Sequence, residues 1–185
     1  MNRNDFSVKK ITTPLQWFRV YCLYRKAFPR YERKPFSIIV SMARKGKTDV
    51  WCCESDGKFV GFASTINGND LILLDYMAVA KSMRGRGIGS GMLQGLQKHY
   101  AGKCLFVEIE SVYEAVPNQE ERMHRKQFYL RNNMQPSQVM ASVFGVNMEL
   151  LCWNCSVNFE QYHSFYNDNY NSWAAEHIIE AEYPE

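Results

Sequence analysis

The chain has 185 residues, of which 46% are hydrophobic and 14% aromatic, and its formal net charge is +3. This length and apolar content are enough to bury one core, so we expect a single domain spanning residues 1–185. No apolar run approaches the roughly 18–20 residues of a membrane-spanning helix, and the N-terminus is polar. We therefore expect a cytoplasmic protein with no membrane partner.

The charges are unevenly distributed along the chain. Residues 1–50 carry 12 Lys or Arg against 3 Asp or Glu, whereas residues 141–185 carry 7 acidic residues and no Lys or Arg. A basic segment can face nucleic acid or an anionic ligand. Here the basic residues are dispersed along expected helices and loops, without a nucleic-acid-binding motif, so we expect no nucleic-acid partner.

The six cysteines do not have the pattern of a disulfide scaffold. Cys22 and Cys104 lie in apolar patterns that are typical of buried free thiols. Cys152 and Cys155 have the Cys-x-x-Cys spacing, but a zinc site would need a second pair or two histidines at matching positions. We therefore predict no metal site and interpret this spacing as coincidence.

The first 46 residues predict a strand and two helices. Residues 6–12 form the expected strand. Thr13 is placed to cap the first helix, with Pro14 at its first position and Gln16 able to complete a capping box. Aromatic residues then follow at helical spacing: Trp17, Tyr21, Tyr24 and Phe28. A linker bracketed by prolines leads to a second short helix, which we expect to end at Gly46.

Three antiparallel strands are expected next. Residues 49–66 contain two β-rich runs around Asp56-Gly57, the strongest short turn signal in the chain. A second turn at 67–70 leads into residues 71–79. This last run is apolar on both faces except for Asp75, as in an inner strand that is covered on both sides.

A basic, glycine-rich loop follows the third strand: Arg84-Gly85-Arg86-Gly87-Ile88-Gly89. Glycines allow a ligand to approach the backbone closely, while a helix N-terminus and guanidinium groups supply positive potential. These features predict a phosphate or pyrophosphate site. The glycine spacing matches neither a dinucleotide fingerprint nor a Walker loop, and an ordinary strand-to-helix turn is the alternative.

The second half of the chain predicts alternating helices and strands. A helix at 88–100 precedes a strand at 104–111, in which Glu108 and Glu110 share one face because strand side chains alternate. Asn118 is expected to start the next helix, with Glu121 placed for a capping box. A late strand at 144–153 and an amphipathic helix at 159–166 complete the prediction.

The spacing Arg84-x-x-Gly87-x-Gly89 after an apolar strand closely resembles the acyl-CoA loop of the GNAT superfamily of acyl-CoA N-acyltransferases. The order of predicted elements is similar to that family's order over nearly the whole chain. The resemblance implies an α+β fold with α/β/α layers, in which a mixed central sheet of about six to seven strands is flanked by about four to five helices.

A second segment resembles a family motif, Phe/Leu-Tyr-x-x-x-Gly-Phe, in which the tyrosine typically donates a proton to the departing CoA thiolate. Tyr129 occupies that position here, and Asn133-Met134 replaces the usual Gly-Phe. Asn tolerates a left-handed helix cap nearly as well as Gly does, so we expect the turn to survive. The alternative for Tyr129 is a core tyrosine with a satisfied hydroxyl group.

The resemblance implies acetyl-CoA as the cosubstrate. In the family, the strand before the loop and the strand after the next helix splay apart, and pantetheine lies in the gap. A backbone N–H near Met77 could then stabilise the tetrahedral oxyanion. The expected cofactor-binding residues are Met77, Ala78, Val79, Arg84, Gly85, Arg86, Gly87, Ile88, Gly89 and Ser90.

The attacking amine must lose a proton, so a carboxylate base is expected. The candidates are Glu108, Glu110 and Asp75, and two like charges on one buried face would raise one pKa towards the working range of a base. Glu110 is favoured because it lies nearer the open end of its strand. Alternatively, one carboxylate faces solvent or pairs with an arginine, such as Arg122 or Arg125.

We therefore predict an N-acetyltransferase that moves an acetyl group from acetyl-CoA to a primary amine by direct attack, with a small molecule as the acceptor. The alternatives are a peptide or protein N-acetyltransferase and a non-catalytic acyl-CoA-binding regulatory module. Residues 24–40 and 136–150 would define the acceptor, but they carry no chemical signature beyond aromatic content. The oligomeric state is open, and a homodimer is one candidate.

Overall fold

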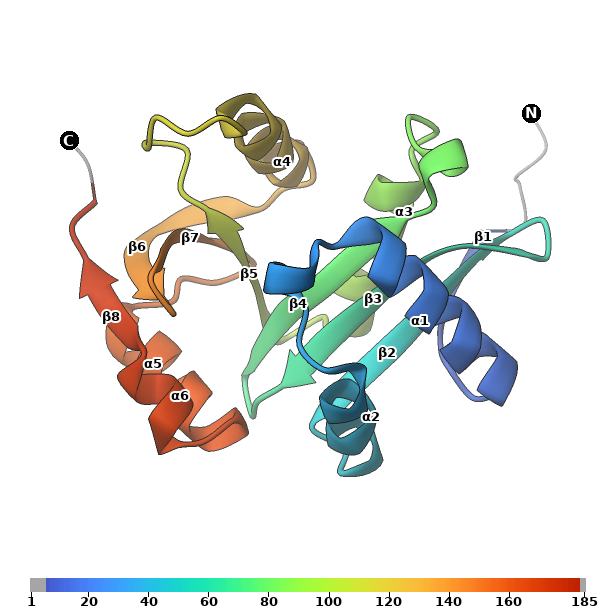
Figure 1. Ribbon diagram of the computed structural model, residues 1–185, viewed down its shortest axis with the longest axis horizontal. Helices are drawn as coiled ribbons and strands as arrows, with labels where there is room; N and C mark the ends of the chain where they lie inside the picture. Colours follow the sequence, from blue (N-terminus) through green and yellow to red (C-terminus); the bar gives the residue numbers. More distant parts are fainter. Residues whose placement is uncertain (1–5, 184–185) are drawn as a thin grey trace. The chain divides into compact units, whose positions relative to one another are not determined.

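The computed structural model describes residues 6–183 (Figure 1). In chain order these residues form β1 (Phe6–Lys10), α1 (Pro14–Ala27), η1 (Arg30–Glu32), α2 (Phe36–Arg44), β2 (Thr48–Ser55), β3 (Lys58–Asn67), β4 (Leu71–Val79), η2 (Lys81–Met83), α3 (Ile88–His99), β5 (Cys104–Glu110), α4 (Gln119–Arg131), β6 (Gln135–Val143), β7 (Val146–Trp153), α5 (Phe159–Asn169), α6 (Ser172–Glu176) and β8 (Ile178–Ala181). The elements η1 and η2 are short 3-10 helices.

The predicted fold class is confirmed, with more elements than expected. Within residues 6–183 the sheet has eight strands and there are six α-helices, whereas the resemblance implied about six to seven strands and about four to five helices. The additional elements are α6 and β8, which lie after the last predicted helix, and β6, in a segment for which no element was predicted.

The chain packs into two compact units. The first unit comprises the residues up to Asn67 together with Leu74–His99, and the second comprises Gly68–Leu73 together with the residues from Tyr100 onward. The strand β4 therefore contributes residues to both units. That the chain acts as one domain stays a prediction.

The strand order is β1-β2-β3-β4-β5-β7-β6-β8. In the first unit, β1 to β3 pair in antiparallel fashion, as predicted. In the second unit, Leu71–Leu73 of β4 pair with β5 in parallel, and β5, β7, β6 and β8 pair in antiparallel fashion. The parallel ladder ends at the pair Leu73 and Phe106, which is where the chain passes from the second unit into the first.

The core of the first unit lies between its sheet and the helices α1 and α2. Val20 and Tyr24 of α1 and Ile39 of α2 pack against Phe62 and Tyr76 of the sheet. Ring contacts link the layers, since the Tyr24 and Tyr76 ring centroids lie 4.9 Å apart at an interplanar angle of 89°. The aromatic residues at helical spacing therefore belong mainly to this core.

The helix α3 packs against β1 in the same unit. It can approach closely because Gly91 and Gly95 face this strand, and a Cβ atom at Gly91 would lie 2.9 Å from the ring of Phe6. At Gly95 the nearest atoms belong to Val8. This close packing fixes the start of α3, and with it the loop that precedes the helix.

The core of the second unit is formed by β5 and α5. Phe106 is fully buried, and its ring meets Tyr162 and Phe165 edge-on, with centroid distances of 6.1 and 5.2 Å. The predicted amphipathic helix at 159–166 is thus confirmed, although α5 continues to Asn169 and has a capping box formed by Asn158 and Gln161.

Most local predictions are confirmed. Thr13 and Gln16 form the expected capping box, and the hairpin turns at Asp56-Gly57, where both residues have positive φ angles. The predicted inner strand matches β4 residue for residue. The capping box at Asn118 is wrong, because its side chain makes no capping hydrogen bond to α4.

Within residues 6–183, no helix is both long enough and apolar enough to cross a lipid bilayer.

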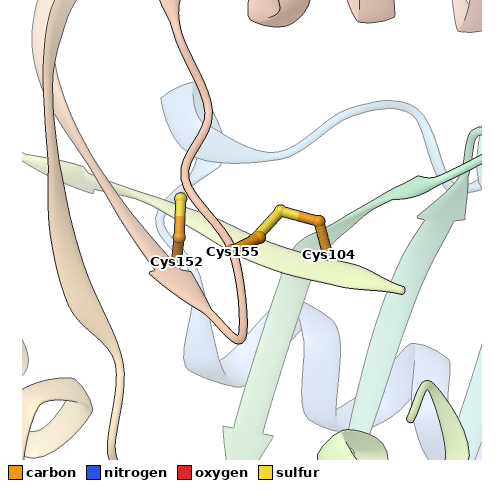
Figure 2. A group of neighbouring side chains, drawn as sticks. All are labelled: Cys104, Cys152 and Cys155. Carbon is orange, nitrogen blue, oxygen red and sulfur yellow. A yellow bond between two sulfur atoms is a disulfide. The ribbon is translucent and has the colours of Figure 1, made fainter. Parts of the chain in front are cut away.

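The prediction that Cys104 is a free thiol is wrong. Cys104, at the start of β5, forms a disulfide with Cys155, which follows β7 and lies 51 residues further along the chain (Figure 2). The Cys152 thiol lies beside this bond, and the three sulfur atoms are all within 4.8 Å of one another. Cys152 and Cys155 are thus not bonded to each other, since Cys155 pairs with Cys104 and Cys152 is a free thiol.

Cys152 remains a thiol in this cluster. Burial raises the pKa of Cys152 to about 11, so the thiolate, which is the reactive form, is scarce at neutral pH. With Cys104 and Cys155 oxidised, only one sulfur could serve as a thiolate ligand for a metal. Disulfides are uncommon in cytosolic proteins, so the cytoplasmic location stays a prediction.

We expect Cys155→Ser to lower the free energy of unfolding by about 2–4 kcal/mol, because the disulfide restricts a long loop in the unfolded chain. Denaturant unfolding with and without dithiothreitol measures this effect. The reductant should destabilise the wild type and leave Cys155→Ser unchanged. Cys22→Ser serves as the control, because Cys22 is unpaired and half-buried. Equal sensitivity of the wild type and Cys155→Ser to reductant would contradict the disulfide.

Candidate functional site

The glycine-rich loop joins β4 to α3 in the first unit. Gly85 and Gly87 have φ angles of 74° and 76°, in the left-handed region that favours glycine. Among the described residues, no atom beyond the glycine and its two chain neighbours lies within 4 Å of the position that a Cβ atom would take at either glycine. The chain from Arg84 to Gly87 is exposed. The alternating glycines are therefore used for backbone conformation, and the space beside them is open.

The loop also presents unpaired backbone donors. Within residues 6–183, the amide N–H groups from Gly85 to Ser90 donate to no protein acceptor, and the first helical bond of α3 runs from the Gly91 N–H to the Gly87 oxygen. The Arg84 Nε donates to the Val79 carbonyl oxygen over 3.4 Å, while the Arg86 side chain is exposed. A helix N-terminus with free amides and two guanidinium groups can bind an anion.

The predicted pantetheine contacts lie at the end of β4. Ala78 is buried, whereas Met77 and Val79 are half-buried and lie on the opposite face of the strand. These three residues and the loop all belong to the first unit. The structure thus brings together all ten residues expected to bind the cofactor, on one continuous segment.

The other predicted site residues lie in the second unit, and Glu108 of β5 is held there by two tyrosines. The hydroxyl groups of Tyr162 and Tyr166 donate to its Oε1 over 2.6 and 2.7 Å. Burial, and next the Glu108 charge, raise the pKa of both tyrosines well above the ordinary value, so they stay protonated donors. The sequence analysis missed these donors, although their spacing of four residues on one helix was visible.

Glu110 pairs with two arginines of α4. The Arg122 Nη2 and the Arg125 Nη1 each lie 3.0 Å from one of its carboxylate oxygens. This arrangement corresponds to the alternative in which a carboxylate binds an arginine. The two guanidinium groups form charge-assisted hydrogen bonds with both carboxylate oxygens of Glu110.

The third candidate base, Asp75, also has a cationic partner. The Lys34 Nζ lies 2.7 Å from its Oδ1, within the first unit. The side chain of Asp75 is mostly buried, and a buried carboxylate requires such a partner. All three carboxylates proposed as bases therefore have hydrogen-bond or ion-pair partners in the protein.

Tyr129 lies in the last turn of α4 and is 7% exposed. Burial raises the pKa of Tyr129 to about 12, although the nearby Arg125 charge opposes the shift. Within residues 6–183, its hydroxyl group forms no hydrogen bond. Tyr129 is thus a protonated phenol with a cation beside it, and this cation also binds Glu110.

The turn after Tyr129 keeps its geometry despite the replacement of glycine. Asn133 has a φ angle of 65°, the left-handed conformation expected of it. The Met134 N–H donates to the Tyr129 carbonyl over 3.1 Å, and the Asn133 N–H donates to the Leu130 carbonyl over 3.1 Å. These two bonds form a Schellman motif, and Met134 is fully buried.

Comparison with known proteins identifies a matching domain model and structures with the same fold. Residues 46–133 match the family model described as "Acetyltransferase (GNAT) domain". A GNAT-family acetyltransferase structure from Bacteroides thetaiotaomicron aligns with a TM-score of 0.75 at 18% identity, covering 89% of this chain and 98% of the other. The predicted GNAT fold is confirmed, and residues 46–133 match the model of a GNAT acetyltransferase domain.

Other solved structures share the fold and act on different acceptors. An aminoglycoside 6'-N-acetyltransferase in complex with coenzyme A aligns with a TM-score of 0.65 at 15% identity, covering 79% of this chain and 95% of the other. The ribosomal-protein-S18-alanine N-acetyltransferase from Escherichia coli aligns with a TM-score of 0.61 at 15% identity, covering 84% and 97%. A search of curated proteins finds no significant match.

We expect the stability of the protein to fall as the pH rises from about 10 to about 12, the pKa of the buried Tyr129. The unfolded tyrosine ionises near pH 10, while the folded one keeps its proton, so the stabilisation is complete below pH 10. In Tyr129→Phe, the free energy of unfolding should fall by about 2 kcal/mol less than in the wild type over this pH range. Denaturant unfolding at pH 8 to 12 measures it, with Tyr31→Phe, at an exposed position, as the control. Identical pH profiles for the wild type and Tyr129→Phe would contradict the raised pKa.

Proposed function

We propose that this protein is an acetyl-CoA-dependent N-acetyltransferase that acetylates a primary amine on a small molecule by direct attack. The observation that carries the proposal is the exposed loop at the start of α3, whose amides from Gly85 to Ser90 lack protein acceptors. The structural relatives that contain coenzyme A or acetyl-CoA support the same cosubstrate.

The loop offers hydrogen-bond donors and positive charge for the pyrophosphate of this cosubstrate. The amides from Gly85 to Ser90 would donate to phosphate oxygens, and Arg84 and Arg86 would add charge-assisted hydrogen bonds. Backbone groups of Met77 and Val79 would pair with the pantetheine arm, with Ala78 buried between them. The thioester then supplies the activated acetyl group.

The chemical step requires one proton donor and one proton acceptor. The amine nitrogen attacks the thioester carbonyl carbon, the carbon–sulfur bond breaks, and the departing thiolate takes a proton from Tyr129. The Arg125 cation beside Tyr129 would stabilise the resulting phenolate. Water or buffer then restores the phenol proton.

The proton of the attacking amine goes to a carboxylate. Glu110 and Glu108 are the candidates, and both carboxylate oxygens of Glu110 already bind guanidinium groups. We assign the proton-accepting role to Glu108, whose Oε1 accepts from the neutral hydroxyl groups of Tyr162 and Tyr166. Glu110 would instead hold Arg125 next to Tyr129.

A protein or peptide acceptor is the second candidate. It is favoured by the similarity to the ribosomal-protein-S18-alanine N-acetyltransferase, just as the aminoglycoside enzyme favours a small molecule. A non-catalytic acyl-CoA-binding module would share the loop but make no use of Tyr129. Screening amines and N-terminal peptides for thiol release from acetyl-CoA distinguishes the three functions.

We expect Arg86→Glu to weaken acetyl-CoA binding by about 10- to 100-fold or more, because a charge-assisted contact is lost and a repulsive charge is introduced. Isothermal titration calorimetry measures the affinity. Lys98→Glu is the matched control, since it makes the same change in charge at the exposed far end of α3. If the wild type fails to bind acetyl-CoA, both the enzyme and the binding-module proposals are wrong.

We expect Tyr129→Phe to lower kcat by about 10²-fold or more, because the leaving thiolate loses its proton donor. The affinity for acetyl-CoA should stay within a factor of about two. Steady-state kinetics of thiol release and calorimetry on the same preparation measure the two quantities. A kcat equal to that of the wild type would remove Tyr129 from the mechanism.

A further inference from the structure

A cleft in the first unit is lined by cationic and aromatic side chains. It has a volume of about 400 Å³ and lies where α1, η1 and the start of α2 meet. Its lining includes four cations and three aromatic rings: Arg25, Arg30, Arg33, Lys34, Tyr21, Tyr24 and Phe36. The cleft lining contains no acidic side chain.

Positive charge in this cleft is only partly neutralised by the protein. Lys34 is paired with Asp75. Arg33 has a buried Nε that finds no hydrogen-bond acceptor among the described residues. The Arg25 guanidinium donates to a neutral group, the Tyr21 hydroxyl, over 3.2 Å. A buried donor without an acceptor is costly, and an anion in the cleft would supply the missing acceptor.

Two buried tyrosines hold the cationic segment in place. The Tyr76 hydroxyl donates to the Glu32 carbonyl over 2.9 Å and accepts the Lys34 N–H over 3.2 Å. The Tyr24 hydroxyl donates to the Lys34 carbonyl over 2.9 Å. These three bonds fix the backbone on both sides of Arg33, so little conformational freedom is lost when a ligand binds.

The aromatic rings give the cleft an apolar side. The ring centroids of Tyr21 and Phe36 lie 5.1 Å apart, and the Arg25 guanidinium lies 5.7 Å from the Tyr21 ring centre. A ligand that is anionic at one end and apolar or aromatic next to it would match this lining. A cationic amine without an acidic group would be repelled.

The cleft is connected to the proposed acetyl-CoA site through β4. Lys34 contacts Asp75, which precedes Met77 by two residues, or about 7 Å of extended strand. All of these residues belong to the first unit. We propose that the cleft binds the carboxylate or phosphate group of the acceptor, so that the substrate is an anionic amine with an apolar or aromatic part. This inference rests on the proposed function.

Binding of anions alone tests the cleft without any catalysis. The full chain is titrated by calorimetry with phenylacetate, with phenyl phosphate and with the neutral control phenylacetamide. We expect at least one anion to bind about tenfold or more tightly than the neutral probe. The stronger of the two anions identifies the acidic group. Phenylacetamide binding as tightly as both anions would overturn the inference.

Variants show whether the cleft is responsible. Arg33→Gln and Arg30→Gln should each weaken anion binding by about tenfold, while acetyl-CoA binding is unchanged. Arg44→Gln, at the exposed end of α2 and outside the cleft, is the matched control and should change neither affinity. Anion binding that is insensitive to both cleft variants would overturn the inference.

Turnover gives a second, independent readout. With acetyl-CoA, kcat/KM for 4-(aminomethyl)benzoate should exceed that for 4-(aminomethyl)benzamide by about tenfold or more, and Arg33→Gln should remove the difference. If kcat/KM is equal for the two substrates while acetyl-CoA still binds, the inference of an anionic acceptor is wrong. That result does not contradict the acetyltransferase proposal. If the cleft binds anions but the protein does not bind acetyl-CoA, the proposed function is wrong instead.

Discussion

Burial of β4 is the constraint on which the site depends. Ile72, Leu73 and Leu74 are 0–2% exposed, and consecutive strand residues point to opposite faces, so both faces of the strand are covered. A strand of this kind cannot shift by one residue without burying Asp75 among apolar groups. Its end is therefore fixed, and so is the start of the loop that presents free amides at α3.

The carboxylates in the structure show how a buried charge is accommodated. Glu108 takes two hydroxyl donors, Glu110 takes two guanidinium groups, and Asp75 takes an ammonium group. The partners of Glu108 and Asp75 lie 41 to 58 residues away in the sequence, whereas those of Glu110 lie on the next helix, α4. Arg125 binds Glu110, and its charge also acts on Tyr129.

Two features of the first unit present hydrogen-bond donors and positive charge, and they differ in construction. The loop at α3 uses backbone amides with arginines at its edge, as suits a phosphate chain. The cleft between α1 and α2 uses side-chain cations with aromatic rings, as suits a smaller anion with an apolar neighbour. The excess of basic residues in the N-terminal segment therefore has a local cause, since four of them line one cleft.

The sequence by itself determined the elements whose signals are local. The capping box at Thr13, the Asp56-Gly57 hairpin, the bounds of β4, the glycine-rich loop and the left-handed Asn133 all follow from neighbouring residues, because backbone conformation and capping depend on short-range sterics and hydrogen bonds. These signals were also enough to indicate the fold.

Only the tertiary structure decided what depends on partners far apart in the chain. The strand β6 contains Pro136 and polar residues that are typical of a loop, and it is a strand because β7 and β8 pair with it. The Cys104–Cys155 disulfide and the tyrosines on Glu108 likewise join distant segments. Sequence spacing carries no information about such contacts, because they form only when the core packs and brings those segments together.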